Sequence, residues 1–338
     1  MRLYVGIDLH SNNSVVVIQD ENDQVVKRKR LENKIETVLA FLESSRDAIS
    51  GVVVESTYNW YWLVDGLQDA GYRMHLANTA AIQQYEGLKH GDDESDARWL
   101  ATLLRLGLLP EGHIYPREER AVRDLVRKRS QLVRNHTRQM LSVENLIVRN
   151  TGKRITAPEV RALTSESVDA LGLEADIVLA IKTNVAVMLC LREQIELVEQ
   201  RVLSKVRLRK QFQGLLTVDG IGKILAMTIM LETGDIKRFK SVGNYVSYCR
   251  CVKSVRLSNH KTKGKGNAKN GNKYLSWAFV EAATYAIRWN ERVKRFFQRK
   301  CARTKRVVAI KATAHKLARA CYYIMSDGGE FDVSRAFG

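Results

Sequence analysis

The first thirty residues, MRLYVGIDLHSNNSVVVIQDENDQVVKRKR (residues 1–30), decide the expected fold. Apolar residues dominate positions 2–7 and 14–19, and residues 24–30 can return as a third extended segment. The polar stretch 20–23 between the second and third segments has the composition of a turn. Short apolar runs bounded by turn residues are typical of β-strands. We therefore predict three consecutive strands that form a meander.

Helices and strands are expected to alternate after this meander. The predicted elements are a helix over 32–42, a buried strand over 49–54, a helix over 58–70, a strand over 73–76, and a helix that Asp93 or Ser95 caps and that runs to about residue 106. This order predicts a mixed α/β sheet with helices on its faces. It is the order of elements in a ribonuclease-H-like (RuvC-like) domain.

Four carboxylates lie at the ends of these elements. Asp8 and Glu55 each close an apolar strand, and Asp93 and Asp96 lie three apart at a helix start, where both can face one side. In this fold they would meet at one edge of the sheet, where concentrated negative charge is costly unless cations neutralise it. Oxygen ligands suit Mg²⁺ or Mn²⁺. Two such ions about 4 Å apart clamp the attacking and leaving oxygens of a phosphodiester displacement.

Other polar residues near these acids leave alternatives open. Asp92 and Glu94 lie in the same loop, and one of these acids could simply cap the helix. Asp92 therefore remains an alternative to Asp93 as the third ligand. His10 follows Asp8 closely, and we interpret it as a lone surface imidazole.

The charge of the 338-residue chain is distributed unevenly. The formal net charge is +18, and an excess of this size implies a polyanionic partner, most often nucleic acid. Residues 1–115 hold 11 basic and 17 acidic side chains, whereas the remainder holds 44 and 20. We therefore expect nucleic acid to be bound by the part after residue 115, although a solvated basic surface is the simpler alternative.

Two long helices are expected in the middle of the chain. The first, over 117–148, is strongly basic, and its candidate nucleic-acid contacts are Arg127, Lys128, Arg129 and Arg134. The second, over about 174–209, has apolar residues at every seventh position: Ile181, Met188, Ile195 and Val202. Such a heptad seam is typical of coiled coils. It could pair within the chain or between two chains.

The last third of the chain contains a glycine motif and a basic segment. Gly220, Gly222 and Lys223 precede an apolar helix over 224–232, as in helix–hairpin–helix modules that bind DNA phosphates through backbone N–H groups. A tight turn needs the same glycines. Residues 250–273 contain no acid and are expected to form a loop ordered by nucleic acid, with candidate contacts at Arg256, Lys261, Lys263, Lys265, Lys269 and Lys273. Two helices follow, over 273–289 and 305–325.

The cysteines and the apolar runs indicate an intracellular protein. The 5 cysteines show no zinc-ligand spacing, which favours free thiols in a reducing cytoplasm. Asp8 interrupts the first apolar stretch, so no signal peptide is expected. No uncharged run approaches the roughly 18 residues of a membrane span. We expect an intracellular protein that does not contact membranes.

Several motifs together resemble one family. The Gly6-Ile7-Asp8-Leu9-His10 opening, Val54-Glu55-Ser56 and the segment 93–98 resemble the DEDD transposases of bacterial insertion sequences. Residues 216–239, the run Arg256-Leu257-Ser258-Asn259 and the run 269–275 resemble the second domain of that family. The resemblance covers nearly the whole chain in the expected order. It is closest to the IS eleven-eleven branch of the IS one-ten group.

The resemblance implies an enzyme that combines two sites. It implies a RuvC-like DEDD domain over 1–112, a basic helical or coiled-coil region over 113–210, and a helical transposase domain over 211–338. Members hold Mg²⁺ on the four acids, and a serine of the second domain forms a covalent phosphoserine link to DNA. A structured noncoding bridge RNA pairs with donor and target double-stranded DNA. The recombinase works as a homodimer that assembles into a tetramer.

Ser258 fits the serine of the family pattern. It lies 14 residues before Asn272, although Asn259 stands where the family usually has glycine. Asn also tolerates a left-handed backbone. Ser254 is the alternative nucleophile. Two other readings remain open: a RuvC-like junction resolvase with water as the nucleophile, and a non-catalytic scaffold that binds RNA or DNA.

Overall fold

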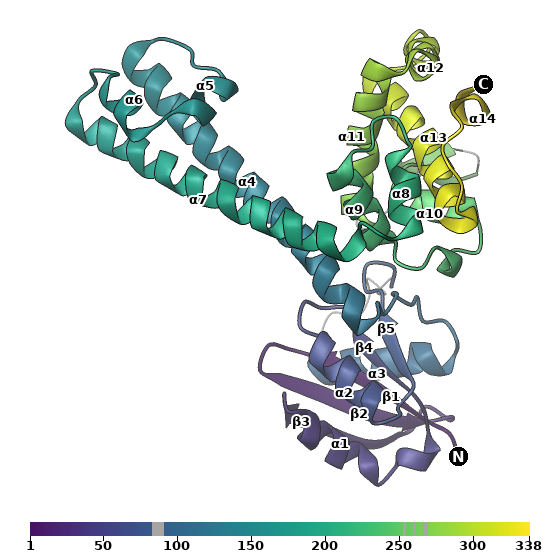
Figure 1. The fold of residues 1–338 in the computed structure, drawn as a ribbon. Helices are drawn as coiled ribbons and strands as arrows, with labels where there is room; N and C mark the ends of the chain where they lie inside the picture. Colours follow the sequence, from purple (N-terminus) through teal and green to yellow (C-terminus); the bar gives the residue numbers. More distant parts are fainter. Residues whose placement is uncertain (83–90, 253–254, 260, 266–269) are drawn as a thin grey trace. The chain divides into compact units, whose positions relative to one another are not determined.

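The computed structural model describes residues 1–82, 91–252, 255–259, 261–265 and 270–338 (Figure 1). The chain divides into two compact units. One unit contains Met1–Arg117 together with Arg256–Asn270, and the other contains Glu118–Val255 together with Gly271–Gly338.

The first unit is built on a five-stranded mixed sheet, as predicted. Its strands are β1 (Leu3–Leu9), β2 (Asn13–Asp20), β3 (Val25–Glu32), β4 (Ile49–Glu55) and β5 (Met74–Ala77). They lie in the order β3-β2-β1-β4-β5. The pairs β1–β2 and β2–β3 are antiparallel, whereas β1–β4 and β4–β5 are parallel. The predicted meander and the ribonuclease-H-like strand order are therefore confirmed.

Strand alternation sends successive side chains of β1 to opposite faces of the sheet. Leu3, Val5 and Ile7 share a core with helices α1 (Ile35–Glu43) and α2 (Tyr61–Asp69). A short 3₁₀ turn, η1 (Arg46–Ala48), leads into β4.

The opposite face of the sheet is covered by α3 (Asp93–Arg105), and a glycine permits its close approach. A Cβ atom added to Gly6 would lie 1.8 Å from the carbonyl oxygen of Ala97. Only glycine allows the two backbones to come this near. Gly6 therefore sets how the first turns of α3 lie against β1.

The second unit begins with a helical hairpin. Helices α4 (Arg117–Thr151) and α7 (Ala175–Val206) pack against each other along much of their length (Figure 1). Their shared core contains Met140, Val143, Ile147, Ile181, Val185 and Met188. The first half of the predicted heptad seam thus pairs within the chain. Two short helices that the sequence analysis did not predict, α5 (Ala157–Ala162) and α6 (Ser165–Asp169), lie between them in sequence and join this core.

A helical bundle completes the second unit. Its elements are α8 (Lys210–Leu216), α9 (Lys223–Thr233), the 3₁₀ turn η2 (Ile236–Arg238), α10 (Val242–Tyr248), α11 (Lys273–Trp289), α12 (Glu291–Cys301), α13 (Arg306–Asp327) and α14 (Val333–Phe337). Phe212, Tyr245 and Phe279 are among the largest fully buried side chains in its core. The helices expected over 224–232, 273–289 and 305–325 are all present.

The segment expected to be a loop between α10 and α11 contains two strands. The strands β6 (Val255–Ser258) and β7 (Lys261–Lys265) pair as a small sheet. The loop expectation is wrong there because backbone pairing does not require the apolar runs that reveal strands in a sequence. Asn259 follows β6 with a φ of +48°, a left-handed conformation that Asn tolerates better than most residues.

All five cysteines are free thiols, as expected. Cys190 is exposed, whereas Cys249, Cys251 and Cys321 are buried. Among the helices in the described ranges, none has both the length and the apolar character that crossing a bilayer requires.

Candidate metal centre

The ends of β1 and β4 bring two predicted acids to the same part of the sheet. Gly6 pairs with Val53 and Ile7 with Val54 in the parallel register, so the next position along each strand is Asp8 and Glu55. Both side chains belong to the set that points toward the α3 face, because alternate residues of a strand share a face. Asp8 is buried, with 7% of its surface exposed, and Glu55 is partly buried.

The start of α3 separates the roles of two neighbouring acids. Asp92 is the N-cap, where its Oδ1 accepts a hydrogen bond of 2.8 Å from the Ser95 backbone N–H. The Asp92 N–H in turn donates to the Ser95 hydroxyl at 2.9 Å. These hydrogen bonds hold the pKa of Asp92 below its usual value. The Asp92 carboxylate is therefore engaged in capping the helix, whereas Asp93 lies against the end of β1.

An imidazole lies between the carboxylates of Asp8 and Asp93. His10 Nε2 lies 3.1 Å from Asp8 Oδ2 and 3.2 Å from Asp93 Oδ2. Interpreting His10 as a lone surface imidazole is therefore wrong. A residue two positions after Asp8 shares its face when the backbone is extended, and this spacing was the signal in the sequence.

A cation from β3 also reaches this cluster. Arg30 donates a 2.6 Å hydrogen bond to Asp93 Oδ2 and a 2.7 Å hydrogen bond to Asn13 Oδ1. The contact with Arg30 lowers the pKa of Asp93. The neighbouring Arg28 forms an ion pair with Glu94. No local sequence pattern reveals a role for these β3 cations, because their acidic partners are more than sixty residues away in the chain.

The remaining acids repel one another electrostatically. Burial raises the pKa of Asp8, and the charges of Asp93 and Asp96 raise it further, although His10 opposes them. Burial, followed by the charges of Asp8 and Asp96, raises the pKa of Glu55. Burial and the charges of Asp93 and Asp92 likewise raise the pKa of Asp96. The four predicted acids thus influence one another.

This donor set fits a divalent cation. A bound cation would stabilise the ionised carboxylates against burial and mutual repulsion. Carboxylate oxygens are the ligands that Mg²⁺ and Mn²⁺ prefer. Within the described parts of the chain, ligand atoms of Asp8, His10 and Asp93 lie within 4.8 Å of one another. The side chains of Glu55 and Asp96 lie near enough to respond to the charge of this group.

A small cleft lies beside the acids. It has a volume of about 260 Å³ and is lined by Val15, by the β3 residues Arg28, Lys29 and Arg30, and by Asp92, Asp93 and Glu94. Its cationic wall and its acidic wall face one cavity. Arg28 and Arg30 are paired with Glu94 and Asp93 across this cleft, so cations and carboxylates lie next to each other beside the candidate metal centre.

The basic residues predicted on α4 differ in their surroundings. Arg127 and Arg129 form ion pairs of 2.6 Å with Glu232 and Glu199 respectively, so their charges are already balanced inside the second unit. Lys128 and Arg134 are exposed. Of the four α4 residues predicted to contact nucleic acid, Lys128 and Arg134 are therefore the ones with exposed charges that are not balanced by an ion pair.

The structure gives the side-chain exposure of only some of the residues predicted in the basic segment. Lys261 and Lys273 are exposed. Arg256, Ser258, Lys263 and Lys265 are described as backbone in β6 and β7. Ser254 and Lys269 lie outside the described residues. The stretch Arg256–Asn270, which contains Ser258, belongs to the same compact unit as the four acids.

The two glycines before α9 differ in whether a side chain would fit at their positions. Gly220 has a φ of +86°, and an added Cβ would lie 2.4 Å from the carbonyl oxygen of Ala282, so packing alone explains this glycine. Gly222 is the N-cap of α9 and has open space around it. Gly222 and the exposed Lys223 line a hollow of about 660 Å³ with Trp289, which is 79% exposed.

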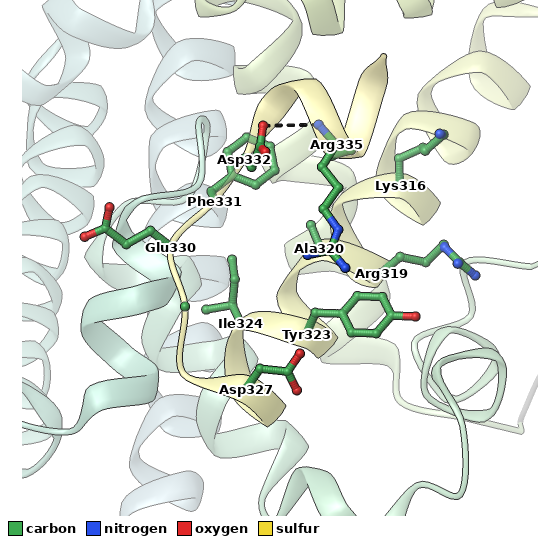
Figure 2. Close-up of a pocket in the computed structure, with 12 residues that line it drawn as sticks. Lys316, Arg319, Ala320, Tyr323, Ile324, Asp327, Glu330, Phe331, Asp332 and Arg335 are labelled. Atoms are coloured by element: carbon green, nitrogen blue, oxygen red, sulfur yellow. Dashed lines mark hydrogen bonds between the residues drawn. The ribbon is translucent and has the colours of Figure 1, made fainter.

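A third cavity lies between α13 and the carboxy-terminal residues (Figure 2). Its volume is about 430 Å³. Three cations and three carboxylates line it: Lys316, Arg319, Arg335, Asp327, Glu330 and Asp332. Asp332 caps α14 by accepting hydrogen bonds from the backbone N–H groups of Ser334 and Arg335. Figure 2 shows the hydrogen bond from Arg335. The balanced charge distinguishes this cavity from the acidic cluster in the first unit.

Two family models match the chain in the order of its sequence motifs. A model of DEDD transposases of the IS110 group, described as "Transposase", matches residues 5–149, and one described as "Transposase IS116/IS110/IS902 family" matches residues 213–298. Together they cover more than half of the chain. The chain belongs to the IS110 family of transposases. It is therefore a DNA-binding enzyme that cleaves and transfers DNA strands.

Two curated relatives resemble this IS110-family transposase over most of its length. A protein of Pseudomonas aeruginosa named "Probable family 20 transposase" is 24% identical over 95% of this chain and 96% of the relative. A protein of Sinorhizobium fredii named as a transposase, y4qE, is 26% identical over 81% of this chain and 67% of the relative. The resemblance expected from the motifs is thus confirmed for the family.

Proposed function

We propose that this transposase is an RNA-guided recombinase of the IS eleven-eleven branch that cuts and rejoins DNA through Ser258. In this proposal Asp8, Glu55, Asp93 and Asp96 hold Mg²⁺ or Mn²⁺. The observation that supports the metal centre is the electrostatic influence of these acids on one another at the ends of β1 and β4 and the start of α3. The assignment of Arg256–Asn270 to the same unit supports a composite site.

The chemistry at Ser258 is a phosphoryl transfer without oxidation or reduction. The Ser258 Oγ–phosphorus bond forms while one bond from phosphorus to a sugar oxygen breaks. The proton of the serine hydroxyl ends on the released sugar oxygen. A bound divalent ion would stabilise negative charge on the phosphate and activate the nucleophile. Attack by a sugar hydroxyl on the phosphoserine reverses the step and rejoins the strands.

Double-stranded DNA and a structured bridge RNA are the proposed partners. Their backbones would contact the exposed Lys128, Arg134, Lys223, Lys261 and Lys273, with Gly220 and Gly222 at the turn before α9. Arg256, Lys263, Lys265 and Lys269 complete this basic set. The proposed regions are the DEDD domain over 1–112, the coiled-coil region over 113–210 and the transposase domain over 211–338.

The helical hairpin supports the proposal of a homodimer that forms a tetramer on DNA. Leu141 on α4 and Leu179 and Leu197 on α7 are each more than half exposed. Leucines exposed on a long amphipathic hairpin favour association with another chain. Light scattering of Leu179→Lys and Leu197→Lys should reveal a smaller species than the wild type, and an unchanged mass would contradict this interface.

A covalent protein–DNA adduct is the decisive test of the serine mechanism. Purified protein, the RNA encoded beside the gene, labelled donor and target DNA, and Mg²⁺ would be analysed on a denaturing gel. We expect an adduct that Ser258→Ala and Asp8→Ala both abolish. Ser254→Ala is the matched control and should retain it.

Three other outcomes would contradict the serine mechanism as proposed. Cleavage without an adduct that survives Ser258→Ala would instead indicate a RuvC-like junction resolvase with water as the nucleophile. Loss of the adduct in Ser254→Ala with retention in Ser258→Ala would move the nucleophile to Ser254. Binding of DNA and RNA with no cleavage in Mg²⁺ would indicate a non-catalytic scaffold.

A further inference from the structure

The imidazole of His10 occupies an unusual place among the acids. Its Nε2 atom is buried, and within the described residues no group is aligned to hydrogen-bond it. Carboxylate oxygens of Asp8 and Asp93 nevertheless lie 3.1 and 3.2 Å away. A nitrogen so placed between two anionic oxygens is one of three ligand atoms gathered around a small space.

The backbone of His10 is held in this position by two amides. Asn33 Nδ2 donates to the His10 carbonyl oxygen at 2.9 Å, and Asn59 Nδ2 donates to the same oxygen at 2.7 Å. The His10 N–H donates to the Asn13 carbonyl at 2.9 Å. These contacts tie the turn after β1 to the residues that follow β3 and β4.

The two amides are themselves oriented by neighbouring hydroxyls. Ser14 Oγ donates to Asn33 Oδ1 at 2.6 Å, and Thr57 Oγ1 donates to Asn59 Oδ1 at 2.9 Å. Each asparagine therefore presents its NH₂ group to His10. This support resembles the outer contacts that fix the ligands of metal sites.

We propose that His10 is a nitrogen ligand of the divalent metal centre, so that the site is mixed nitrogen and oxygen rather than oxygen alone. The inference rests on the proposed function to the extent that the acids must hold a metal. Imidazole is a poor ligand for Mg²⁺ and a better one for transition metals. The centre should therefore prefer Mn²⁺ to Mg²⁺ more strongly than a site made only of carboxylates.

The alternative role for His10 is a counter-charge that leaves the metal to the carboxylates. Both roles place the imidazole near Asp8 and Asp93, but only a ligand has nitrogen bonded to the ion. A direct spectroscopic measurement of nitrogen at the metal separates them without any measurement of activity.

The test uses the full chain with Mn²⁺ as the probe. Pulsed electron paramagnetic resonance on the Mn²⁺-loaded wild type should detect ¹⁴N coupling. His10→Ala should lose this coupling and bind Mn²⁺ about tenfold more weakly or worse, since even outer contacts of metal ligands are worth 10–100-fold in affinity. Mg²⁺ affinity should fall by a smaller factor.

Three variants complete the design. His136→Ala, on α4 in the other unit, is the matched control and should retain the coupling. His10→Gln preserves side-chain size if the alanine variant folds poorly, and it should lose the coupling because its amide coordinates through oxygen. Asp8→Asn should abolish Mn²⁺ binding.

The outcomes distinguish this inference from the proposed function. Mn²⁺ bound in the wild type without ¹⁴N coupling, and lost in Asp8→Asn, overturns the role of His10 and leaves the carboxylate centre intact. Coupling that persists in both His10 variants also overturns it. A wild type that binds no Mn²⁺ overturns both.

Discussion

Arg127 on α4 forms a bidentate ion pair with Glu232 on α9. The side chain of Glu232 is fully buried. Arg127 Nε donates to Glu232 Oε1 at 2.6 Å, and its Nη2 donates to Oε2 at 2.8 Å. Asn272 Nδ2 donates to the same Oε2 at 2.7 Å. Asn272 is also the N-cap of α11. One buried carboxylate thus links the helical hairpin to the helix that follows the Ser258 segment.

Removing one partner of this pair should destabilise the protein strongly. Arg127→Met removes an arginine that pairs with the buried Glu232 carboxylate, and breaking a buried ion pair costs about 3–5 kcal/mol. The double variant Arg127→Met/Glu232→Met should be more stable than Arg127→Met, because the buried carboxylate is removed together with the arginine. Urea unfolding measures both.

The matched control for the Arg127 variant is Arg129→Met. Arg129 pairs with Glu199, which is 30% exposed, so water can solvate the carboxylate that remains. We expect the free energy of unfolding to fall by about 1 kcal/mol or less, because the remaining Glu199 carboxylate is partly exposed whereas that of Glu232 is buried. Equal losses in the two arginine variants would show that the burial of Glu232 is not the cause.

Gly6→Ala should damage both stability and the metal centre. The new Cβ would lie 1.8 Å from the Ala97 carbonyl oxygen, so α3 must move away from β1. Overpacking of this kind costs about 1–3 kcal/mol or more. Because Asp93 and Asp96 move with α3, affinity for Mn²⁺ should fall as well. Calorimetry with and without Mn²⁺ measures both effects.

Gly329→Ala is the control for this substitution, because nothing lies within 4 Å of its added Cβ. Unchanged melting temperature and Mn²⁺ affinity are expected there. A Gly6→Ala variant with wild-type stability and Mn²⁺ binding would contradict the close packing of α3 on β1.

Asp8→Asn should stabilise the metal-free protein near neutral pH. Burial raises the pKa of Asp8, and the charges of Asp93 and Asp96 raise it further, so the ionised form is less favourable in the folded chain than in the unfolded chain. This penalty is present above the raised pKa and vanishes as pH falls below the ordinary carboxyl value of about 4. The stability gained by Asp8→Asn over the wild type should therefore shrink as pH falls. Melting temperatures across pH measure it.

Two comparisons test the origin of that pH dependence. Glu32→Gln should show the opposite sign, because a hydrogen bond from Lys34 lowers the pKa of Glu32. Saturating Mg²⁺ should reverse the order of wild type and Asp8→Asn, since only the wild type gains binding energy. An Asn advantage that is independent of pH would contradict the electrostatic explanation.

The cysteine thiols should differ sharply in reactivity. Cys190 is exposed, whereas burial raises the pKa of Cys251 to about 11 and the pKa values of Cys249 and Cys321 well above normal. The thiolate is the reactive form. Ellman's reagent at pH 8 should modify Cys190 first in the folded protein. The three buried thiols should react only after unfolding.

The matched variant for this measurement is Cys190→Ser. It should remove the fastest phase and leave the slower reaction of the partly exposed Cys301. Rapid reaction of a buried cysteine in the folded protein would show that the second unit opens readily.

Much of the first unit was predictable because its signals are local. The apolar runs before Asp8 and Glu55 predict strands, and strand alternation places both acids on one face. The spacing of Asp93 and Asp96 predicts a shared side of a helix. These relationships depend only on residues within a few positions, where the periodicity of a strand or helix determines geometry.

The tertiary structure decided which distant groups meet. It placed His10 and Arg30 beside Asp93, assigned Asp92 to the helix cap, and balanced Arg127 with a glutamate 105 residues away. It also paired α4 with α7 in one chain. By itself the sequence determined the strands, the helices and the acidic residues, because neighbours along the chain set these. Ion-pair partners come from the packing of separate elements, which local patterns do not encode.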